Sequence, residues 1–319
     1  LLGMIHLFGA KAVNIATVTT CILLIVIVIG RRAATAYSAN LKQMLSARAI
    51  SGVELPLNDP GTAEMLVSML RDPDPRTAMC GMDLLDRDPR PEFRPAFAEA
   101  LRHPDAGVRA RSAAAMQRQA GPEDLPLLRQ ALQGESDPGV LMELLPALAR
   151  AGGDDCVDTL QARLQDSDPR ILQGALVGLA RHGGSAGVSI AGRMLEKLST
   201  DRDPANRAFV AETLGKVGAS SLDGFIVPLL KDEVLGVRRT AIEAARYLHN
   251  PLLGAPVVEN LAEPELRPTV VETLVEGSEV MLPPVDELYD QSRNKMELRA
   301  MILHIYGRVK TAEGIRLLE

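Results

Sequence analysis

A short pattern of residues recurs about every 31 residues over most of this 319-residue chain and restricts its fold more than any other feature. The copies place mostly apolar or small residues two, six and ten positions after the Pro position of a turn that is written Asp-Pro or Glu-Pro in five copies. The Pro position falls at residues 75, 106, 138, 169, 204, 235, 264 and 296, which gives separations of 31, 32, 31, 35, 31, 29 and 32. A near-constant period of this length predicts a stack of similar units, because one unit cannot bury its own apolar face.

The order of residues within a copy predicts two short antiparallel helices. In DPGVLMELLPALARAG, residues 137–152, an Asp can cap the first helix and Pro fits its first turn, where a missing N–H costs little. A Gly then ends this helix in a left-handed conformation, at residues 152, 183, 218 and 277 in four of the copies. A second apolar segment follows, such as CVDTLQARL, which begins at Cys156.

This arrangement resembles the short HEAT repeats, especially the class that also occurs in phycobilin lyases. The resemblance rests on the turn, on a following Val-Arg pair, and on Ala, Leu and Gly further along; the pair stands at Val108-Arg109 and Val237-Arg238, and as Leu298-Arg299. It covers residues 62–319 and implies an all-α fold, a curved α-solenoid of about eight HEAT-like helix pairs. We expect the second helices to form the concave surface and the repeated Arg to pair with turn Asp residues of adjacent units.

A different environment is predicted for the start of the chain. Residues 12–30 contain no charge, and at 1.5 Å per residue they span roughly 28 Å, the thickness of a bilayer core. Arg31 and Arg32 follow at once, so the positive-inside rule places the later residues in the cytoplasm. We therefore expect one transmembrane helix at 12–30. A signal peptide and a buried soluble helix are the alternatives.

The flanking segments extend this interpretation. Residues 1–11 are interpreted as the possible end of an upstream membrane element, and residues 31–61 as a basic exit helix and a linker. A last membrane helix, a basic exit helix and HEAT repeats together resemble the C-terminal part of bacterial transporters related to the nucleotide (ATP/ADP) translocases. This second resemblance implies the bacterial inner membrane, with the repeats cytoplasmic. It assigns no transport residue, because the substrate-binding helices would precede Leu1.

No pattern in the chain indicates catalysis, a cofactor or a metal. The three Cys and five His form no metal-binding motif, and neither a P-loop nor a GxSxG motif occurs. Asp154-Asp155 and Asp201–Asp203 are interpreted as helix caps. The chain after residue 50 has a net charge of −11 and few aromatic residues, which does not favour binding to nucleic acid. We therefore predict no enzyme activity, no catalytic, cofactor-binding or metal-binding residues, and no identifiable small-molecule site.

The function predicted from these features is that of a membrane-tethered HEAT-repeat scaffold. It would bind protein partners on its concave face at the cytoplasmic side, and its acidic charge would favour a basic partner. One alternative is the regulatory C-terminal part of a multi-span, major-facilitator-like membrane transporter. A second alternative is a repeat-containing lyase, which would require a pocket with clustered polar groups.

Overall fold

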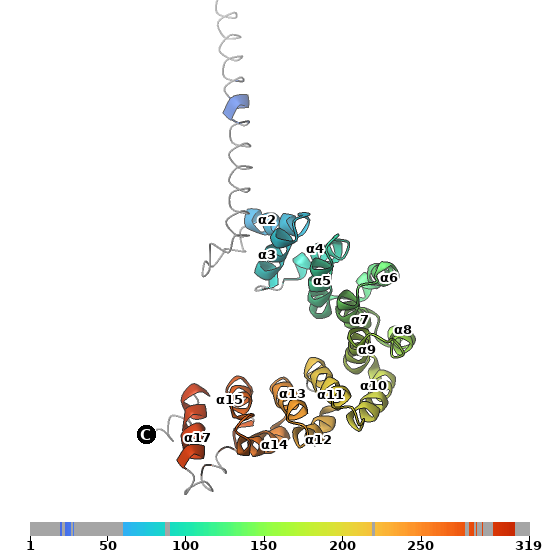
Figure 1. Ribbon diagram of the computed structural model, residues 1–319. Coiled ribbons are helices and arrows are strands. Elements are labelled where there is room, and N and C mark those ends of the chain that lie inside the picture. The colour runs from blue at the N-terminus through green and yellow to red at the C-terminus, as the bar shows by residue number, and fades with distance from the viewer. Residues whose placement is uncertain are drawn as a thin grey trace, which may run out of the picture. The chain divides into compact units, whose positions relative to one another are not determined.

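The computed structural model consists of helices wherever it describes the chain (Figure 1). The described residues are 20, 23–26, 28, 60–86, 90–218, 221–277, 281–283, 285, 289 and 296–309. They belong to two compact units, residues 1–112 and residues 113–319, and each unit is described by itself.

The first unit is built from the helices that precede and begin the repeat pattern. Its elements are α2 (Pro60–Leu70), α3 (Pro75–Asp86), the 3-10 helix η1 (Pro91–Phe93), α4 (Arg94–Ala100) and the first half of α5 (Ala106–Gln119). Leu66, Met82 and Phe97 are each at most 1% exposed and form part of its core. Arg111 holds the unit together from outside, because its guanidinium lies 3.1 Å from Asp83 and 2.9 Å from Asp86.

The second unit contains the second half of α5 and the remaining helices. These are η2 (Pro122–Asp124), α6 (Leu125–Gly134), α7 (Pro138–Gly152), η3 (Gly153–Cys156), α8 (Val157–Arg163), α9 (Pro169–His182), α10 (Gly184–Ser199), α11 (Pro204–Val217), η4 (Asp223–Phe225), α12 (Ile226–Leu230), α13 (Leu235–Ala245), η5 (Pro251–Leu253), α14 (Gly254–Glu259), η6 (Asn260–Ala262), α15 (Arg267–Glu276) and α17 (Met296–Val309).

The helices of the second unit lie in two rows (Figure 1). One row contains α7, α9, α11, α13, α15 and α17, which begin at or near the predicted repeat positions and pack against one another in chain order. We call these the first-row helices. The second row consists of α6, α8, α10, α12 and α14, of which α6, α8, α10 and α12 pack against first-row helices. The two rows bury side chains of Leu, Val, Ile and Ala between them, as a solenoid of helix pairs requires.

The predicted helix starts are confirmed at residue precision in six copies, at 75, 106, 138, 169, 204 and 235, and in a seventh copy α17 is described from residue 296 onward. The eighth differs: Pro264 lies in a turn, and α15 begins three residues later, at Arg267. The reason is Pro268, which has no N–H to donate within a helix. Because α15 begins at Arg267, Pro268 falls in its first turn, where no donor is needed.

Local hydrogen bonds explain why the starts are fixed so firmly. The Asp137 carboxylate accepts hydrogen bonds from the N–H groups of Gly139 at 2.8 Å and Val140 at 3.0 Å, as the capping interpretation predicted. A second acceptor stands two residues before the cap, where Glu135 Oε1 accepts from the Asp137 N–H at 2.9 Å. Asp201 and Asp203 repeat this pair before α11, so that acidic segment is a helix cap. Two consecutive side-chain turns therefore set the entry angles of α7 and α11.

The predicted left-handed glycines are confirmed only in part. Gly218 has φ +75° and ends α11 as expected. In two other copies the positive φ belongs to the next residue, Gly153 at +52° and Gly184 at +56°. The prediction is wrong at Gly277, where φ is −71° and the chain leaves α15 in an extended conformation.

Arginines link one repeat to the next, as the predicted ladder requires. Arg238 lies 3.5 Å from Glu263 in the following turn, where the partner is Glu and not the predicted Asp. A closer link, not anticipated from the sequence, joins Arg207 in α11 to Asp232, with both guanidinium bonds between 2.6 and 2.9 Å. The Arg207 guanidinium and the Val234 N–H hold the pKa of the Asp232 carboxyl below its ordinary value of 3.8. Arg109 behaves differently, because it donates to the carbonyls of His103 and Pro104 in its own turn.

The segments before the repeats can be compared with the prediction only in part. Helix α2 begins at Pro60, inside the segment 31–61 interpreted as exit helix and linker. Residues 1–11 and most of 12–30 and 31–61 lie outside the described residues. Within the part of the chain that is described, no helix combines the length and the apolar character needed to cross a bilayer, so the predicted transmembrane helix is not found there.

Candidate functional site: a groove across the first-row helices

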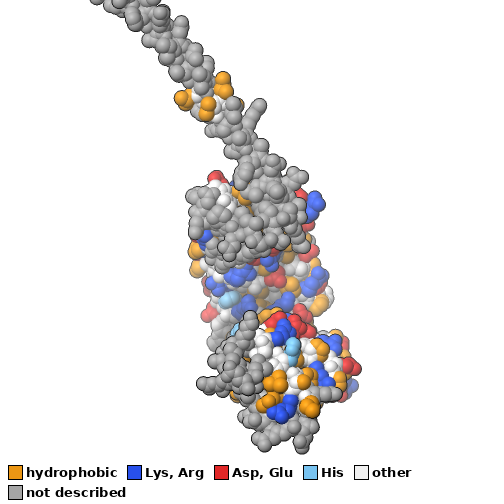
Figure 2. All heavy atoms as spheres, turned by 90° about the vertical axis from the view of Figure 1, so that its left-hand side faces the viewer, with side chains coloured by type: hydrophobic (Ala, Val, Ile, Leu, Met, Phe, Trp, Pro, Cys, Tyr) orange, Lys and Arg blue, Asp and Glu red, His pale blue; other side chains and the backbone are white. Residues whose placement is uncertain are grey.

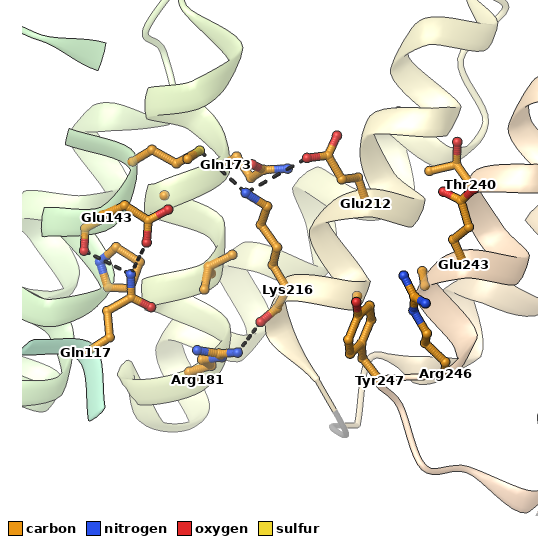
Figure 3. A pocket seen from close by; sticks show the side chains of 16 residues that line it. Gln117, Glu143, Gln173, Arg181, Glu212, Lys216, Thr240, Glu243, Arg246 and Tyr247 are labelled. Carbon is orange, nitrogen blue, oxygen red and sulfur yellow. Dashed lines mark hydrogen bonds and ion pairs between the residues drawn. The ribbon is translucent and has the colours of Figure 1, made fainter. Parts of the chain in front are cut away.

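A groove with a volume of about 470 Å³ crosses the first-row helices of the second unit (Figure 3). A volume of this size is typical of a ligand-binding pocket. Its lining comes from the end of α5, from the first-row helices α7, α9, α11 and α13, and from the two residues that follow α13: Gln117, Met142, Glu143, Pro146, Gln173, Gly174, Val177, Arg181, Glu212, Gly215, Lys216, Thr240, Glu243, Ala244, Arg246 and Tyr247.

This location corrects the prediction of a concave surface made by the second helices. The hollow lies on the helices that begin at the repeat turns, the first of each pair, and its lining contains no residue of α6, α8, α10, α12 or α14. The groove residues recur with helical spacing, four or five, eight and twelve positions after the Pro position, and so occupy one face of each helix.

The floor of the groove is apolar and closely packed. Pro146 and Val177 are buried. Gly174 of α9 faces α7 and has no side chain that would keep the two helices apart. A Cβ atom on Gly174 would lie 2.5 Å from the carbonyl oxygen of Met142. That oxygen receives no helical hydrogen bond from residue 146, because proline has no N–H. The two backbones therefore approach as closely as these residues permit.

Polar side chains of the first helices are mostly bonded to one another. Gln117 donates from its amide to the Glu143 carboxylate at 2.5 Å and to the Glu143 carbonyl at 3.1 Å (Figure 3). Gln173 is 4% exposed and its amide lies 3.5 Å from the hydroxyl of Thr213. These contacts fix the walls of the groove at α7, α9 and α11.

The basic side chains of the groove are also engaged. Arg181 donates from Nε to the Val217 carbonyl at 2.9 Å and from Nη2 to the Lys216 carbonyl, at the C-terminal end of α11. Lys216 Nζ lies 3.6 Å from the Met142 sulfur and 3.9 Å from Glu212, with both contacts drawn in Figure 3. Arg181 thus binds backbone that would otherwise lack a donor.

An exposed aromatic ring stands at the far end of the groove. Tyr247 is 52% exposed, and the Arg246 guanidinium lies 4.8 Å from its ring centre. Arg246 is in turn held by Glu276, with Nη1 2.7 Å from the carboxylate. A tyrosine in this position provides a large, rigid contact surface with a polar tip, which is typical of residues that dominate binding.

Acidic and basic side chains are interspersed on the described surface (Figure 2). The groove lining itself has three acidic residues, Glu143, Glu212 and Glu243, and three basic ones, Lys216, Arg181 and Arg246. The number of charged residues in the lining therefore gives no net acidic charge, which was the property predicted to favour a basic partner. The preference for a basic partner depends on which of these groups are already paired.

The residues with the most reactive side chains lie elsewhere and have structural roles. Cys156 is buried, its thiol donates to the Leu148 carbonyl at 3.5 Å, and burial raises the thiol pKa. His103 accepts from the Asp105 N–H at Nδ1 and lies 2.9 Å from the Asp72 carbonyl at Nε2. Throughout the described part of the chain, no three His, Cys, Asp or Glu side chains are grouped so as to hold a metal.

The polar pocket that the lyase alternative requires is present in the form of this groove. Its amine, on Lys216, is already within reach of Glu212, and the hydroxyl of Thr240 donates to the Gly236 carbonyl at 3.1 Å. These contacts do not bring the Lys216 amine or the Thr240 hydroxyl next to a further side chain that could accept its proton. The arrangement offers apolar contacts and charge for binding, and its walls are held by internal hydrogen bonds.

The sequence named no site residue, although one signal was available. Aligning the copies on their Pro positions places Pro146, Val177, Glu212 and Glu243 at the same position, eight residues further on. This alignment would have identified one face of the first-row helices. It would not have shown that the face is hollow, because that depends on helix packing.

Comparisons with known proteins support the repeat interpretation. Residues 63–149 match the family model of HEAT repeats, which confirms the first resemblance over this part of the chain. None of the curated proteins compared with the chain matches it. The resemblance of the N-terminal segment to transporters is not shown by these comparisons.

Two solved structures share the helical arrangement at low similarity. Human deoxyhypusine hydroxylase in complex with glycerol is 16% identical, with a TM-score of 0.37, and the match covers 78% of this chain and 96% of that one. The Escherichia coli protein YibA is 14% identical, with a TM-score of 0.40, and the match covers 86% of this chain and 97% of that one. At TM-scores this low the likeness has no bearing on what the chain does.

Proposed function

We propose that this chain is a HEAT-repeat scaffold that binds a protein partner across the first-row helices of its second unit. The observation that carries the proposal is the groove, because it combines an apolar floor, a polar rim and an exposed tyrosine on one face. The end of α5 and four successive first-row helices contribute to it, so it suits an elongated partner better than a small molecule. Its walls are fixed by internal hydrogen bonds, which lowers the cost of ordering on binding.

Site-specific photocrosslinking tests this proposal. A photoreactive amino acid replaces Tyr247 in the groove, and in a matched control it replaces Gln165, which lies in the exposed hollow between α8 and α10. We expect protein adducts in cells from position 247 and none from position 165. Equal adducts from both positions, or no protein adduct from position 247, would contradict a partner-binding groove.

We also propose that the chain is tethered to a bilayer through residues 12–30, with the repeats on the cytoplasmic side of the bacterial inner membrane. Support comes from the described residues of this segment: Leu23, Leu24, Ile25 and Val26 are helical and between 56% and 63% exposed. Successive helical residues are about 100° apart, so these four present apolar surface in all directions. A surface of this kind is stable when lipid surrounds it.

Alkaline extraction of membranes from cells that express the full chain tests the tether. We expect the wild-type chain to stay in the membrane pellet and the double variant Leu24→Arg/Val26→Arg to be released. A charged residue in the middle of a bilayer costs about 2.5–3.5 kcal/mol, so two are sufficient to shift the distribution. Release of the wild-type chain by alkali would contradict the tether and leave the groove proposal unaffected.

A further inference from the structure

Three glutamates occupy the same position in three successive repeats. Glu212 in α11, Glu243 in α13 and Glu272 in α15 each stand eight residues after the Pro position of their copy. Since α11 packs against α13 and α13 against α15, these side chains form a row across neighbouring first-row helices, and we call them the glutamate row. Its first two members line the groove, so the row continues the groove toward α15.

The carboxylates of the glutamate row are largely available. All three residues are exposed, and neither Glu243 nor Glu272 forms a side-chain hydrogen bond or ion pair with any residue that the structure describes. Glu212 has Lys216 at 3.9 Å, a long contact between two exposed groups. An exposed pair of this kind contributes little and exchanges readily for another cation.

Two of the three cations in the groove lining are committed in a way that Glu243 and Glu272 are not. Arg181 is bonded to backbone carbonyls of α11, and Arg246 is bonded to Glu276 and stacked on Tyr247. The lining has equal numbers of acidic and basic residues, but the charged groups that remain available to an incoming ligand are not equal in number. The groups open to a partner are predominantly anionic, next to the apolar floor and the ring of Tyr247.

From this row we infer that the groove binds an extended, basic, polyproline-II-like segment of the partner protein, with Lys or Arg at every third residue. The inference rests on the proposed function and specifies its partner. Packed helices are about 8–10 Å apart, so the glutamates repeat at about that distance. A polyproline-II segment has three residues per turn and rises about 3.1 Å per residue, so residues three apart share a side and lie about 9 Å apart.

The same geometry places one apolar residue of the segment at the end nearest α7 and α9. There Pro146 and Val177 form the buried floor, and the volume of about 470 Å³ admits a few side chains but not a whole peptide. The segment thus lies across the helices, with an apolar side chain in the hollow and basic side chains over the glutamate row.

Three fluorescent decapeptides test the inference on the full chain by anisotropy. The first is Leu-Pro-Pro-Lys-Pro-Pro-Lys-Pro-Pro-Lys, the second has the same composition with its three Lys adjacent, and the third has Glu in place of Lys. We expect the first to bind most tightly and the third least. Equal binding of the first two, or tighter binding of the third, would overturn the assigned chemistry.

Variants of the protein locate the contact. Each of Glu212→Gln, Glu243→Gln and Glu272→Gln should weaken the first peptide about two- to fivefold, the range expected for an exposed ion pair. Glu196→Gln removes the same charge from α10 in the second row and should leave affinity unchanged. If Glu196→Gln weakened the peptide equally, the effect would come from the overall charge of the protein and not from the glutamate row, and the inference would be wrong. A photocrosslinked partner at position 247 combined with no peptide preference would refute this inference alone, and the partner-binding function would stand.

Discussion

Replacing Gly174 by alanine tests the packing that forms the groove. The added Cβ would lie 2.5 Å from the Met142 carbonyl oxygen, 2.8 Å from its Cα and 3.0 Å from its carbonyl carbon. Non-bonded heavy atoms are comfortable at about 3.5 Å or more, so α9 would have to move about 1 Å away from α7. The obstructing atoms are all backbone, so no side chain can rotate to make room.

The magnitude follows from two opposing effects. Alanine is favoured over glycine inside a helix by about 1 kcal/mol. Overpacking a well-filled interface costs about 1–3 kcal/mol, and contacts with backbone place this site in the upper part of that range. We therefore expect Gly174→Ala to lower the free energy of unfolding by about 1–2 kcal/mol and to widen the groove.

The measurement needs to be local as well as global, because a repeat array need not unfold in one step. Denaturant unfolding of the full chain followed by circular dichroism gives the midpoint, and hydrogen exchange shows whether α7 and α9 lose protection. Gly236→Ala is the matched control, since nothing lies within 4 Å of a Cβ there. A Gly174→Ala chain as stable as the wild type would refute the reasoning.

Three further changes probe other parts of the second unit. Asp137→Ala removes two hydrogen bonds from the start of α7 and should cost about 1 kcal/mol in the same unfolding assay, whereas Asp137→Asn, which keeps a capping oxygen, should cost little. His249 has φ +49°, so His249→Gly should raise stability by about 1 kcal/mol and His249→Ala should not; equal effects would contradict backbone strain there. Burial, Arg150 and Arg181 lower the pKa of His182 below its ordinary value of 6.5. Its folded pKa is depressed, so stability should decline as pH falls below 6.5 toward that lower value, and His182→Gln should remove this part of the decline in unfolding measured against pH. A decline of the same size in the variant would refute the assignment.

The helix starts were predictable because short-range contacts determine them. The Asp137 carboxylate bonds to N–H groups two and three residues away, and Pro138 fits the first turn whatever lies around it. The same local logic explains the exception at Pro264. Pro268, only four residues further on, disfavours a helix that starts at 264, although α7 accommodates Pro146 in its interior, and this preference was readable from the sequence.

Contacts between repeats were less accessible from the sequence. Arg207 and Asp232 are 25 residues apart. Arg207 occupies the Arg position of the Val-Arg pair in its copy, but Asn206 precedes it in place of Val, so the pair was not recognised in the sequence. The glutamate row could have been found by aligning the copies. Its availability could not, because it depends on which cations in three dimensions bind backbone, other carboxylates or a ring.

The sequence alone therefore determined the period, the order of helices and nearly every first-row helix start, since these are set within a few residues of the chain. Only the tertiary structure decided which row forms the groove. Both rows carry apolar faces, and a pattern of apolar residues does not distinguish them. The choice follows from how closely backbones approach: Gly174 meets the carbonyl of Met142, and Gly215 leaves room for Ala244 and Tyr247. Such distances arise from the packing of helices against one another, which no single segment of the chain encodes.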